Sequence, residues 1–282
     1  MLGPLLFVIY INDLPDVCRA FSSLFLFADG AKMYRTLQSD TDYLLLQDCC
    51  NLVSNWSQQW CMNLNVDKCK VLSISAKKCN KKINNYCIDS NGVPCLLENV
   101  ESMNDLGVTI DHTLDFSVHI HDKINKAFQM LGIINRNFND LGKITFLLLY
   151  KCMVRSHLEF ASSVWNPYKV SLISDLEKVQ KRATKMVSDC RHLSYKNRLI
   201  HLNLPTLKFR RARGDMIEVY KILQGLYDSD IVPLLLRNTY SATRGNKFKL
   251  AHVRSHYDLR KYSFCSRVVD YGTVFLIILS LL

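Results

Sequence analysis

One carboxylate of this sequence stands at the tip of a predicted hairpin. Asp29 lies between an apolar run at residues 24–27 and a second run that ends at Tyr34. Two short strands suit these runs, and Asp29-Gly30 supplies the positive φ angles that a two-residue turn requires. A turn-forming Asp without chemistry is the plain alternative. If the hairpin carries chemistry, Asp29 is the residue that performs it.

The segment before the hairpin favours the chemical interpretation. Residues 2–14 read Leu-Gly-Pro-Leu-Leu-Phe-Val-Ile-Tyr-Ile-Asn-Asp-Leu. This segment and the Phe27-Ala28-Asp29-Gly30 hairpin together resemble the reverse transcriptases of non-LTR (jockey/CR1-like) retrotransposons, in which the hairpin reads Phe-Ala-Asp-Asp. Further blocks match in the same order, at residues 150–155, 158–167, 176–184 and 210–217. The chain therefore resembles the C-terminal part of an RNA-directed DNA polymerase.

The resemblance implies a magnesium site that this sequence lacks in part. In the family, two Mg²⁺ ions lie between the two hairpin carboxylates and a third Asp from an earlier strand, and they hold the attacking and leaving oxygens. Asp29 matches the first hairpin acid and is the implied metal ligand, but the second position is Gly30. The third Asp would lie upstream of Met1. Because a lone Asp29 cannot position two Mg²⁺ ions, we expect an inactive site.

Two further residues are candidates through the same resemblance. Lys68 matches a lysine expected near the incoming nucleotide, and an outward-facing strand lysine is the alternative. Gly107 lies in a segment that resembles the strand pair contacting the primer, where it would allow nucleic-acid backbone to approach. An ordinary strand bulge is the alternative for Gly107.

Charge is unevenly placed along the 282 residues, whose net charge is +11. Residues 1–66 hold 3 Lys+Arg against 6 Asp, whereas residues 67–282 hold 33 Lys+Arg against 19 Asp+Glu. The interval 169–213 alone holds 12 basic and 3 acidic residues. Such a cluster attracts a phosphate backbone. The predicted nucleic-acid contacts are Lys178, Lys181, Arg182, Lys185, Arg210, Arg211 and Arg213, and a merely solvated helix face is the alternative for each.

The order of predicted elements indicates an α+β fold. Residues 1–113 are expected to form a partial polymerase palm, with a helix at 5–17, the hairpin, a helix at 40–63, a strand at 68–75 and a hairpin around Asn91-Gly92. Residues 114–227 are expected to form an all-α thumb and connecting region. Residues 228–282 are expected to form an irregular tail whose last part departs from the family.

Other features exclude several classes. The 11 cysteines include no Cys-x-x-Cys pair, so neither a zinc ribbon nor a disulfide framework is expected. His119 and His121 would point to different faces of a helix and are not expected to share a metal. The apolar end at residues 274–282 is far shorter than the ~20 residues that span a bilayer. We expect a nuclear or cytoplasmic protein, not a secreted one.

Three hypotheses follow for the function. The first is a truncated, inactive reverse transcriptase-like protein that still binds nucleic acid, with an RNA template and a DNA primer as the implied partners. The second is a nucleotidyltransferase completed by another chain, which would have to place the missing Asp accurately. The third is a host-adopted helical interaction module that binds no nucleic acid. The position of the basic cluster favours the first.

Overall fold

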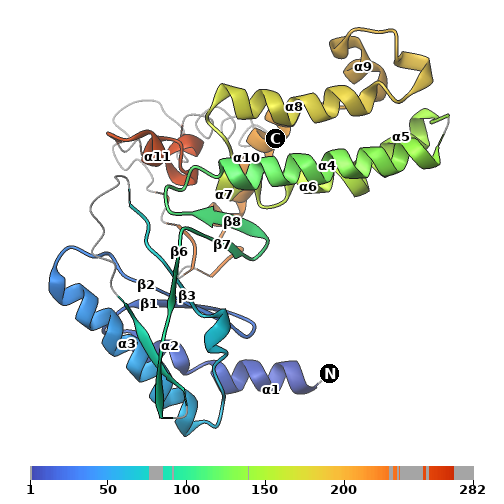
Figure 1. The fold of residues 1–282 in the computed structure, drawn as a ribbon. Coiled ribbons are helices and arrows are strands. Elements are labelled where there is room, and N and C mark those ends of the chain that lie inside the picture. The colour runs from blue at the N-terminus through green and yellow to red at the C-terminus, as the bar shows by residue number, and fades with distance from the viewer. Residues whose placement is uncertain are drawn as a thin grey trace. The chain divides into compact units, whose positions relative to one another are not determined.

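The structure is a computed structural model that describes residues 2–75, 85–90, 92–138, 140–228, 231–233, 235, 250–251 and 254–269. The chain divides into two compact units, Met1–Met103 and Asn104–Leu282 (Figure 1). The boundary between the units lies between residues 103 and 104, before the predicted boundary between residues 113 and 114. The reason is that strand β8 (Val108–Asp111) packs on the first long helix of unit 2, α4 (Ser117–Asn137).

Unit 1 begins with two helices where one was predicted. Helix α1 spans Leu2–Ile11 and α2 spans Leu14–Cys18. Pro15 lies in the first turn of α2, where a backbone N–H would have no partner within the helix. Because proline has no N–H to donate, it cannot extend the backbone hydrogen bonds of α1, and the two helices are separate. Most apolar side chains of α1 are exposed, namely Leu2, Leu5, Leu6, Val8 and Ile9.

Helix α3 (Asp40–Gln59) supplies most of the core of unit 1. Its N-cap is Ser39, which forms a capping box with Asp42. The sequence offers Thr41 and Asp42 as capping residues, and of these two Asp42 takes part in the box. The helix ends before the predicted residue 63, and Cys61 beyond it has a left-handed φ of 53°. One face of α3 packs on α2 and on the hairpin that follows α2. The core residues are Ile11, Leu14, Cys18, Cys49, Val53 and Trp56.

The predicted hairpin at Asp29 is present. Strand β1 (Ser23–Phe27) pairs antiparallel with β2 (Gly30–Tyr34), and Phe27 is opposite Gly30. The side chains alternate, as a pleated strand requires. Leu24, Leu26 and Met33 pack on the core, whereas Phe25, Phe27 and Tyr34 are exposed.

The remaining strands of unit 1 are short. The strand predicted at 68–75 is reduced to β3 (Lys70–Leu72), which pairs in parallel with β6 (Glu98–Val100). The predicted second hairpin is confirmed as β4 (Cys87–Ser90) paired with β5 (Val93–Leu96). Within the described residues the strands form four separate two-stranded sheets. A polymerase palm stays a prediction.

Unit 2 is mainly helical, as predicted. Strand β7 (Ser102–Asp105), at the junction of the units, forms a hairpin with β8. After α4, a continuous helix comprises α5 (Lys143–Leu149), the π-helical η2 (Tyr150–Arg155) and α6 (Ser156–Glu159). The rest are α7 (Ser162–Trp165), α8 (Val170–Thr184), the 3₁₀ turn η3 (Ser188–Cys190), α9 (Tyr195–Leu202), α10 (Leu207–Leu223) and α11 (Asp258–Lys261).

The core of unit 2 lies between α4, the η2 segment and α8. Helices α4 and α8 run side by side in Figure 1 and contact each other. The helical spacing of Phe116, Ile120, Ile124, Phe128 and Leu131 predicts one apolar face. That face is present on α4, because Ile120, Ile124 and Leu131 are buried while Phe116 and Phe128 pack on them. Among the helices that the structure describes, none combines the length and the apolar character that a bilayer crossing requires.

Some predictions fall on residues outside the described ranges. These are most of residues 77–85, whose polar and basic composition predicts a loop, and Cys79 within them, which is expected to be an ordinary thiol. Asn91 of the second hairpin turn and much of the tail at 228–282, including its apolar end, also lie outside.

Candidate nucleic-acid interface

Asp29 is exposed at the hairpin tip, as predicted, but the turn differs from the prediction. The two loop residues are Ala28 and Asp29, and Gly30 is already the first residue of β2. Ala28 carries the positive φ, 51°, and Gly30 does not have one. A positive φ at the first loop residue alone is the pattern of a type II′ turn. The prediction that Asp29-Gly30 supplies the positive φ angles was therefore wrong.

The donor atoms at this tip do not fit a two-magnesium site. Gly30 offers no side-chain oxygen beside the Asp29 carboxylate. Within the described part of the chain, no three His, Cys, Asp or Glu side chains gather as a metal ion would require. Two Mg²⁺ ions need several carboxylates with near-octahedral geometry, together with substrate phosphates. The Asp29 carboxylate alone does not meet these requirements.

Lys68 and Gly107 take positions other than those predicted. Lys68 ends a 3₁₀ turn, η1 (Val66–Lys68), instead of beginning a strand, and it is exposed. Gly107 is the second residue of the two-residue loop between β7 and β8, with a φ of 83°. A Cβ atom at Gly107 would lie 3.2 Å from the ring of Phe160. The group that approaches Gly107 closely is therefore an aromatic side chain of the same unit.

Helix α8 presents a basic face. Lys178, Lys181 and Arg182 lie on the helix, and Lys185 is its C-cap. Their spacing of three, four and seven residues places all four on one side of an α-helix, and all four are exposed. The opposite face is buried through Leu172, Leu176, Val179 and Ala183. The predicted grouping of these four cations on one helix is therefore present.

Aromatic rings support two of these cations. The Lys181 ammonium lies 5.5 Å from the ring centre of Tyr195, and the Arg182 guanidinium lies 5.5 Å from that of Phe128 on α4. Such contacts hold a cation at a defined place and leave its hydrogen-bond donors available. Lys178 is instead paired with Asp175, at 2.7 Å. Lys181, Arg182 and Lys185 form no ion pair within the described residues.

A buried polar network fixes the inner side of α8. Tyr150 donates a hydrogen bond of 2.6 Å to Gln180, which donates in turn to Tyr195, 3.2 Å away. Tyr195 donates to Glu177, and the second oxygen of Glu177 accepts from the Leu207 amide, at 3.1 Å. Burial raises the pKa of both tyrosines. These bonds join η2, α8, α9 and α10, so the basic face is attached to a rigid support.

The three arginines predicted on α10 do not act together. Arg210 pairs with both oxygens of Glu159, which also lies 3.6 Å from Arg155. Arg211 is buried; its Nε donates to Asn166, at 3.1 Å, and burial lowers its pKa. Only Arg213 is exposed. Arg211 was therefore wrongly assigned to a surface contact, and the charge of Arg210 is already balanced.

The buried arginines belong to structural clusters that were not predicted. Arg198 donates to Thr184 and to the carbonyl oxygen of Leu193, at 3.0 and 2.7 Å, near the end of α8. Arg267 forms a bidentate ion pair with the buried Asp215, with two hydrogen bonds of 2.9 Å each. Separations of 14 and 52 residues within these pairs leave no local sequence signal. Of the 12 basic residues in the interval 169–213, three bind partners within the fold, so about a quarter of this cluster stabilises the structure. These three are Arg198, Arg210 and Arg211.

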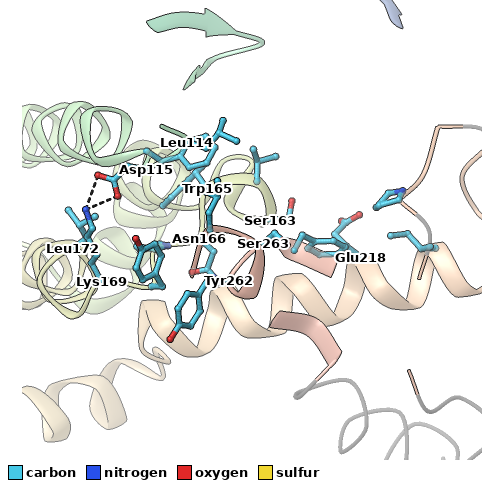
Figure 2. A pocket seen from close by; sticks show the side chains of 18 of the residues that line it. Leu114, Asp115, Ser163, Trp165, Asn166, Lys169, Leu172, Glu218, Tyr262 and Ser263 are labelled. Carbon is cyan, nitrogen blue, oxygen red and sulfur yellow. Dashed lines mark hydrogen bonds and ion pairs between the residues drawn. The ribbon is translucent and has the colours of Figure 1, made fainter. Parts of the chain in front are cut away.

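Unit 2 also contains a cavity of about 500 Å³. Figure 2 shows Trp165, Asn166 and Tyr262 on its wall and the Lys169–Asp115 pair at one end. The Lys169 ammonium lies 2.7 Å from Asp115, so the single Lys or Arg among the described lining residues is neutralised. Glu218 adds a further carboxylate. This lining is unsuited to phosphate, and the exposed basic face of α8 is the better candidate.

Comparisons with known proteins find a distant similarity to an RNA-directed DNA polymerase, the kind of protein that the sequence motifs resemble. The chain is 23% identical over 220 residues to the probable RNA-directed DNA polymerase from transposon X-element of Drosophila melanogaster; the match covers 72% of this chain and 22% of that protein. It is 28% identical over 128 residues to uncharacterized protein B0403.1 of Caenorhabditis elegans, covering 44% of this chain and 65% of that protein. No family model and no solved structure matches. The chain is thus distantly similar to a transposon reverse transcriptase.

Proposed function

We propose that this chain is a reverse transcriptase-related protein that binds nucleic acid through the basic face of α8 and does not extend primers. The observation that carries the proposal is one exposed helix face that holds Lys181, Arg182 and Lys185, none of them in an ion pair within the described residues, with the Asp175-paired Lys178 beside them. The inner side of this helix is anchored. The similarity to the X-element polymerase supports a nucleic-acid partner. Since the chain spans 22% of that protein's length, the activity of the whole relative is not carried over.

The basic face suits the backbone of nucleic acid better than its bases. From Lys178 to Lys185 the helix rises on the order of 10 Å, and a duplex carries one charge for each ~1.7 Å of its axis. Long, exposed Lys and Arg side chains at this spacing neutralise several phosphates without reading base edges. We therefore expect binding that is insensitive to base sequence and steeply dependent on salt.

The experiment is a salt titration of binding by fluorescence anisotropy, with labelled single-stranded RNA, single-stranded DNA and an RNA–DNA hybrid. Each released counterion contributes ~0.7 to ~0.9 to the slope of log affinity against log salt. Changing Lys181 and Arg182 together to Ala should lower the slope by about one to two units. Because both side chains are exposed, the free energy of unfolding should change little.

A matched control removes the same charge from unit 2 elsewhere. Lys169 and Lys221 are each held by an acidic partner, Asp115 and Glu218, at 2.7 and 3.1 Å. The Lys169→Ala, Lys221→Ala double variant should therefore keep the parent slope. Equal slopes for the two double variants would contradict the α8 interface. A parent that binds none of the three probes at ~0.15 M salt would favour the helical interaction module instead.

A further inference from the structure

The cavity of unit 2 has a wall rich in aromatic rings. Its volume of about 500 Å³ lies within the ~300–1,000 Å³ of pockets that bind small molecules. Trp165 belongs to α7, whereas Tyr262 follows α11, and Figure 2 shows both at the cavity. The wall is therefore built from parts of unit 2 that are distant in sequence. The aromatic lining residues are Phe116, Trp165, Tyr168, Tyr227, Tyr262 and Phe264.

Two of these rings are stacked on each other. The ring planes of Tyr168 and Tyr262 differ by 3°, and the ring centres are 4.7 Å apart. This contact joins the segment before α8 to the segment after α11. Two lining segments thus contact each other directly, as expected of a pocket that exists before a ligand arrives.

A buried arginine holds the lining segments in place. Arg267 donates from Nη1 to the carbonyl oxygen of Tyr262, at 3.2 Å, and from Nη2 to the carbonyl oxygen of Ser163. Its bidentate pair with Asp215 adds helix α10 to the arrangement. Because both charges are buried, separation of the pair would leave an uncompensated charge, which is strongly unfavourable. The cavity is therefore preformed.

The charged groups of the described lining are already paired. Lys169 lies 2.7 Å from Asp115, and Glu218 lies 3.1 Å from Lys221. Glu218 also accepts a hydrogen bond of 2.6 Å from the Tyr227 hydroxyl. An ionised ligand would lose its hydration here without meeting an unpaired opposite charge, and such a transfer is unfavourable. The lining therefore favours an uncharged molecule.

We propose that this cavity binds an uncharged aromatic molecule. Any apolar ligand gains from leaving water, but an aromatic one also pairs with the rings of the wall in offset or edge-to-face geometry. The paired charges disfavour nucleotides and other phosphate-bearing ligands. The site is therefore separate in chemistry from the exposed cations of α8, and its test does not depend on whether nucleic acid binds there.

The test compares two dyes that share one aromatic skeleton. N-phenyl-1-naphthylamine is uncharged, and 8-anilinonaphthalene-1-sulfonate is the same molecule with a sulfonate group. The fluorescence of both rises when they leave water, so each can be titrated with the full chain. We expect saturable binding of the uncharged dye, weakened about tenfold in Tyr262→Ala because a ring of the wall is lost. The affinity for the sulfonate should be the same in the parent and in Tyr262→Ala.

Tyr257→Ala is the matched control. Tyr257 is the N-cap of α11, is 69% exposed and does not line the cavity, whereas Tyr262 is 36% exposed. Tyr257→Ala should bind the uncharged dye as the parent does. Equal affinity of the parent and folded Tyr262→Ala for this dye would overturn the proposal. An equal loss of affinity for both dyes in Tyr262→Ala would show that the site does not select against charge, and would also overturn it.

A photochemical label locates the site in the unaltered protein. 1-Azidonaphthalene is uncharged, releases nitrogen on illumination and inserts into nearby side chains, and the labelled peptides are identified by mass spectrometry. We expect label within residues 162–172 or 257–269, and its loss when excess N-phenyl-1-naphthylamine is present. Label confined to the exposed apolar helix α1 would overturn the proposal. This measurement decides the location even if Tyr262→Ala fails to fold.

Discussion

Gly30 contributes no side-chain oxygen to the hairpin tip, and its missing side chain allows close packing against the Phe27 backbone. A Cβ atom at Gly30 would lie 3.3 Å from the carbonyl oxygen of Phe27, its partner across the hairpin. A side chain therefore requires a shift of a few tenths of an ångström, and no unfavourable φ opposes it. Gly30 places no second carboxylate beside Asp29, and the fold does not depend on the glycine.

We expect Gly30→Asp to fold, with a loss of about 1 kcal/mol or less, because Asp is a poor strand residue at an exposed site. It should not gain primer extension with Mg²⁺ or Mn²⁺, since the described residues bring no further acid into a metal-binding group. Thermal unfolding checks the first expectation. Incorporation of labelled nucleotide on a primed template checks the second.

An active reverse transcriptase in a parallel reaction shows that the template, primer and nucleotides are competent. Extension by the parent protein above a heat-denatured sample would contradict the inactive site. Extension by Gly30→Asp alone would show that one restored carboxylate is enough to hold the metal ions.

His119 is a second residue whose surroundings set its chemistry. Its imidazole is buried, and its Nδ1 accepts a hydrogen bond of 3.0 Å from the Thr109 amide. Its Nε2 has no hydrogen-bond partner within the described residues, and the centres of the His119 and Trp165 rings are 5.4 Å apart. Burial lowers the pKa of His119 to about 4. His121, two residues on, is exposed, so the two histidines face apart as predicted.

This pKa predicts a loss of stability in mild acid. The ordinary pKa of histidine is 6.5, so between pH 6.5 and 4 the unfolded chain binds a proton that the folded chain does not. Stability from neutral His119 is complete above pH 6.5 and falls as the pH approaches 4. Between pH 7 and 5 we expect a loss of about 2 kcal/mol, measured by urea unfolding.

His119→Gln keeps an acceptor for the Thr109 amide and cannot titrate, so its stability should depend less on pH in this interval. His121→Gln, on the same helix but exposed, serves as the matched control and should follow the parent. Parallel pH profiles for the parent and His119→Gln would show that His119 is not the group responsible.

At the scale of elements, periodicity predicted the long helices and the basic face of α8. The residues that pack inward, such as Leu176 and Val179, recur at helical spacing, and the cations occupy the remaining positions. The sequence pattern predicts a helix at 175–187, whereas α8 begins five residues earlier, at Val170. The start of α8 has no side-chain cap that would mark it in the sequence. Pro167, three residues before Val170, indicates the start of this helix better than the first charged residue does.

Pairing between distant residues could not be predicted in the same way. Arg210 and Arg211 are as basic in sequence as Lys181, but Glu159 and Asn166, 51 and 45 residues away, hold them. The hairpin was predicted from Asp29-Gly30, yet Ala28 carries the positive φ. Local sequence indicates which residues favour a turn or a helix, whereas only the packed chain determines which charges remain available.

At the scale of the molecule, unit 1 exposes an unusual amount of apolar surface. Helix α1 is apolar on every side, and its exposed Leu5, Leu6 and Ile9 retain 59%, 59% and 65% of their accessible area. The hairpin adds Phe27, at 61%. Soluble monomers rarely leave contiguous apolar patches larger than a few hundred Å².

We therefore expect the purified chain to self-associate in light scattering, and protease to cut within residues 1–40 before it cuts the helices of unit 2. Leu5→Lys with Ile9→Glu should reduce association without lowering the free energy of unfolding, because both side chains are exposed. Replacing the exposed Ile144 and Leu148 of α5 in the same way is the matched control. A monodisperse parent that resists protease across residues 1–40 would contradict this expectation.

The buried polar network of unit 2 has a consequence for cooperativity. Tyr150, Gln180, Tyr195 and Glu177 satisfy one another across four elements, and the Leu207 amide completes the chain. If one of these elements separates, buried polar atoms on the others lose their partners at a cost of about 1–3 kcal/mol each. Partly opened forms of these helices are therefore scarce, and the support of the basic face is lost in a single all-or-none event.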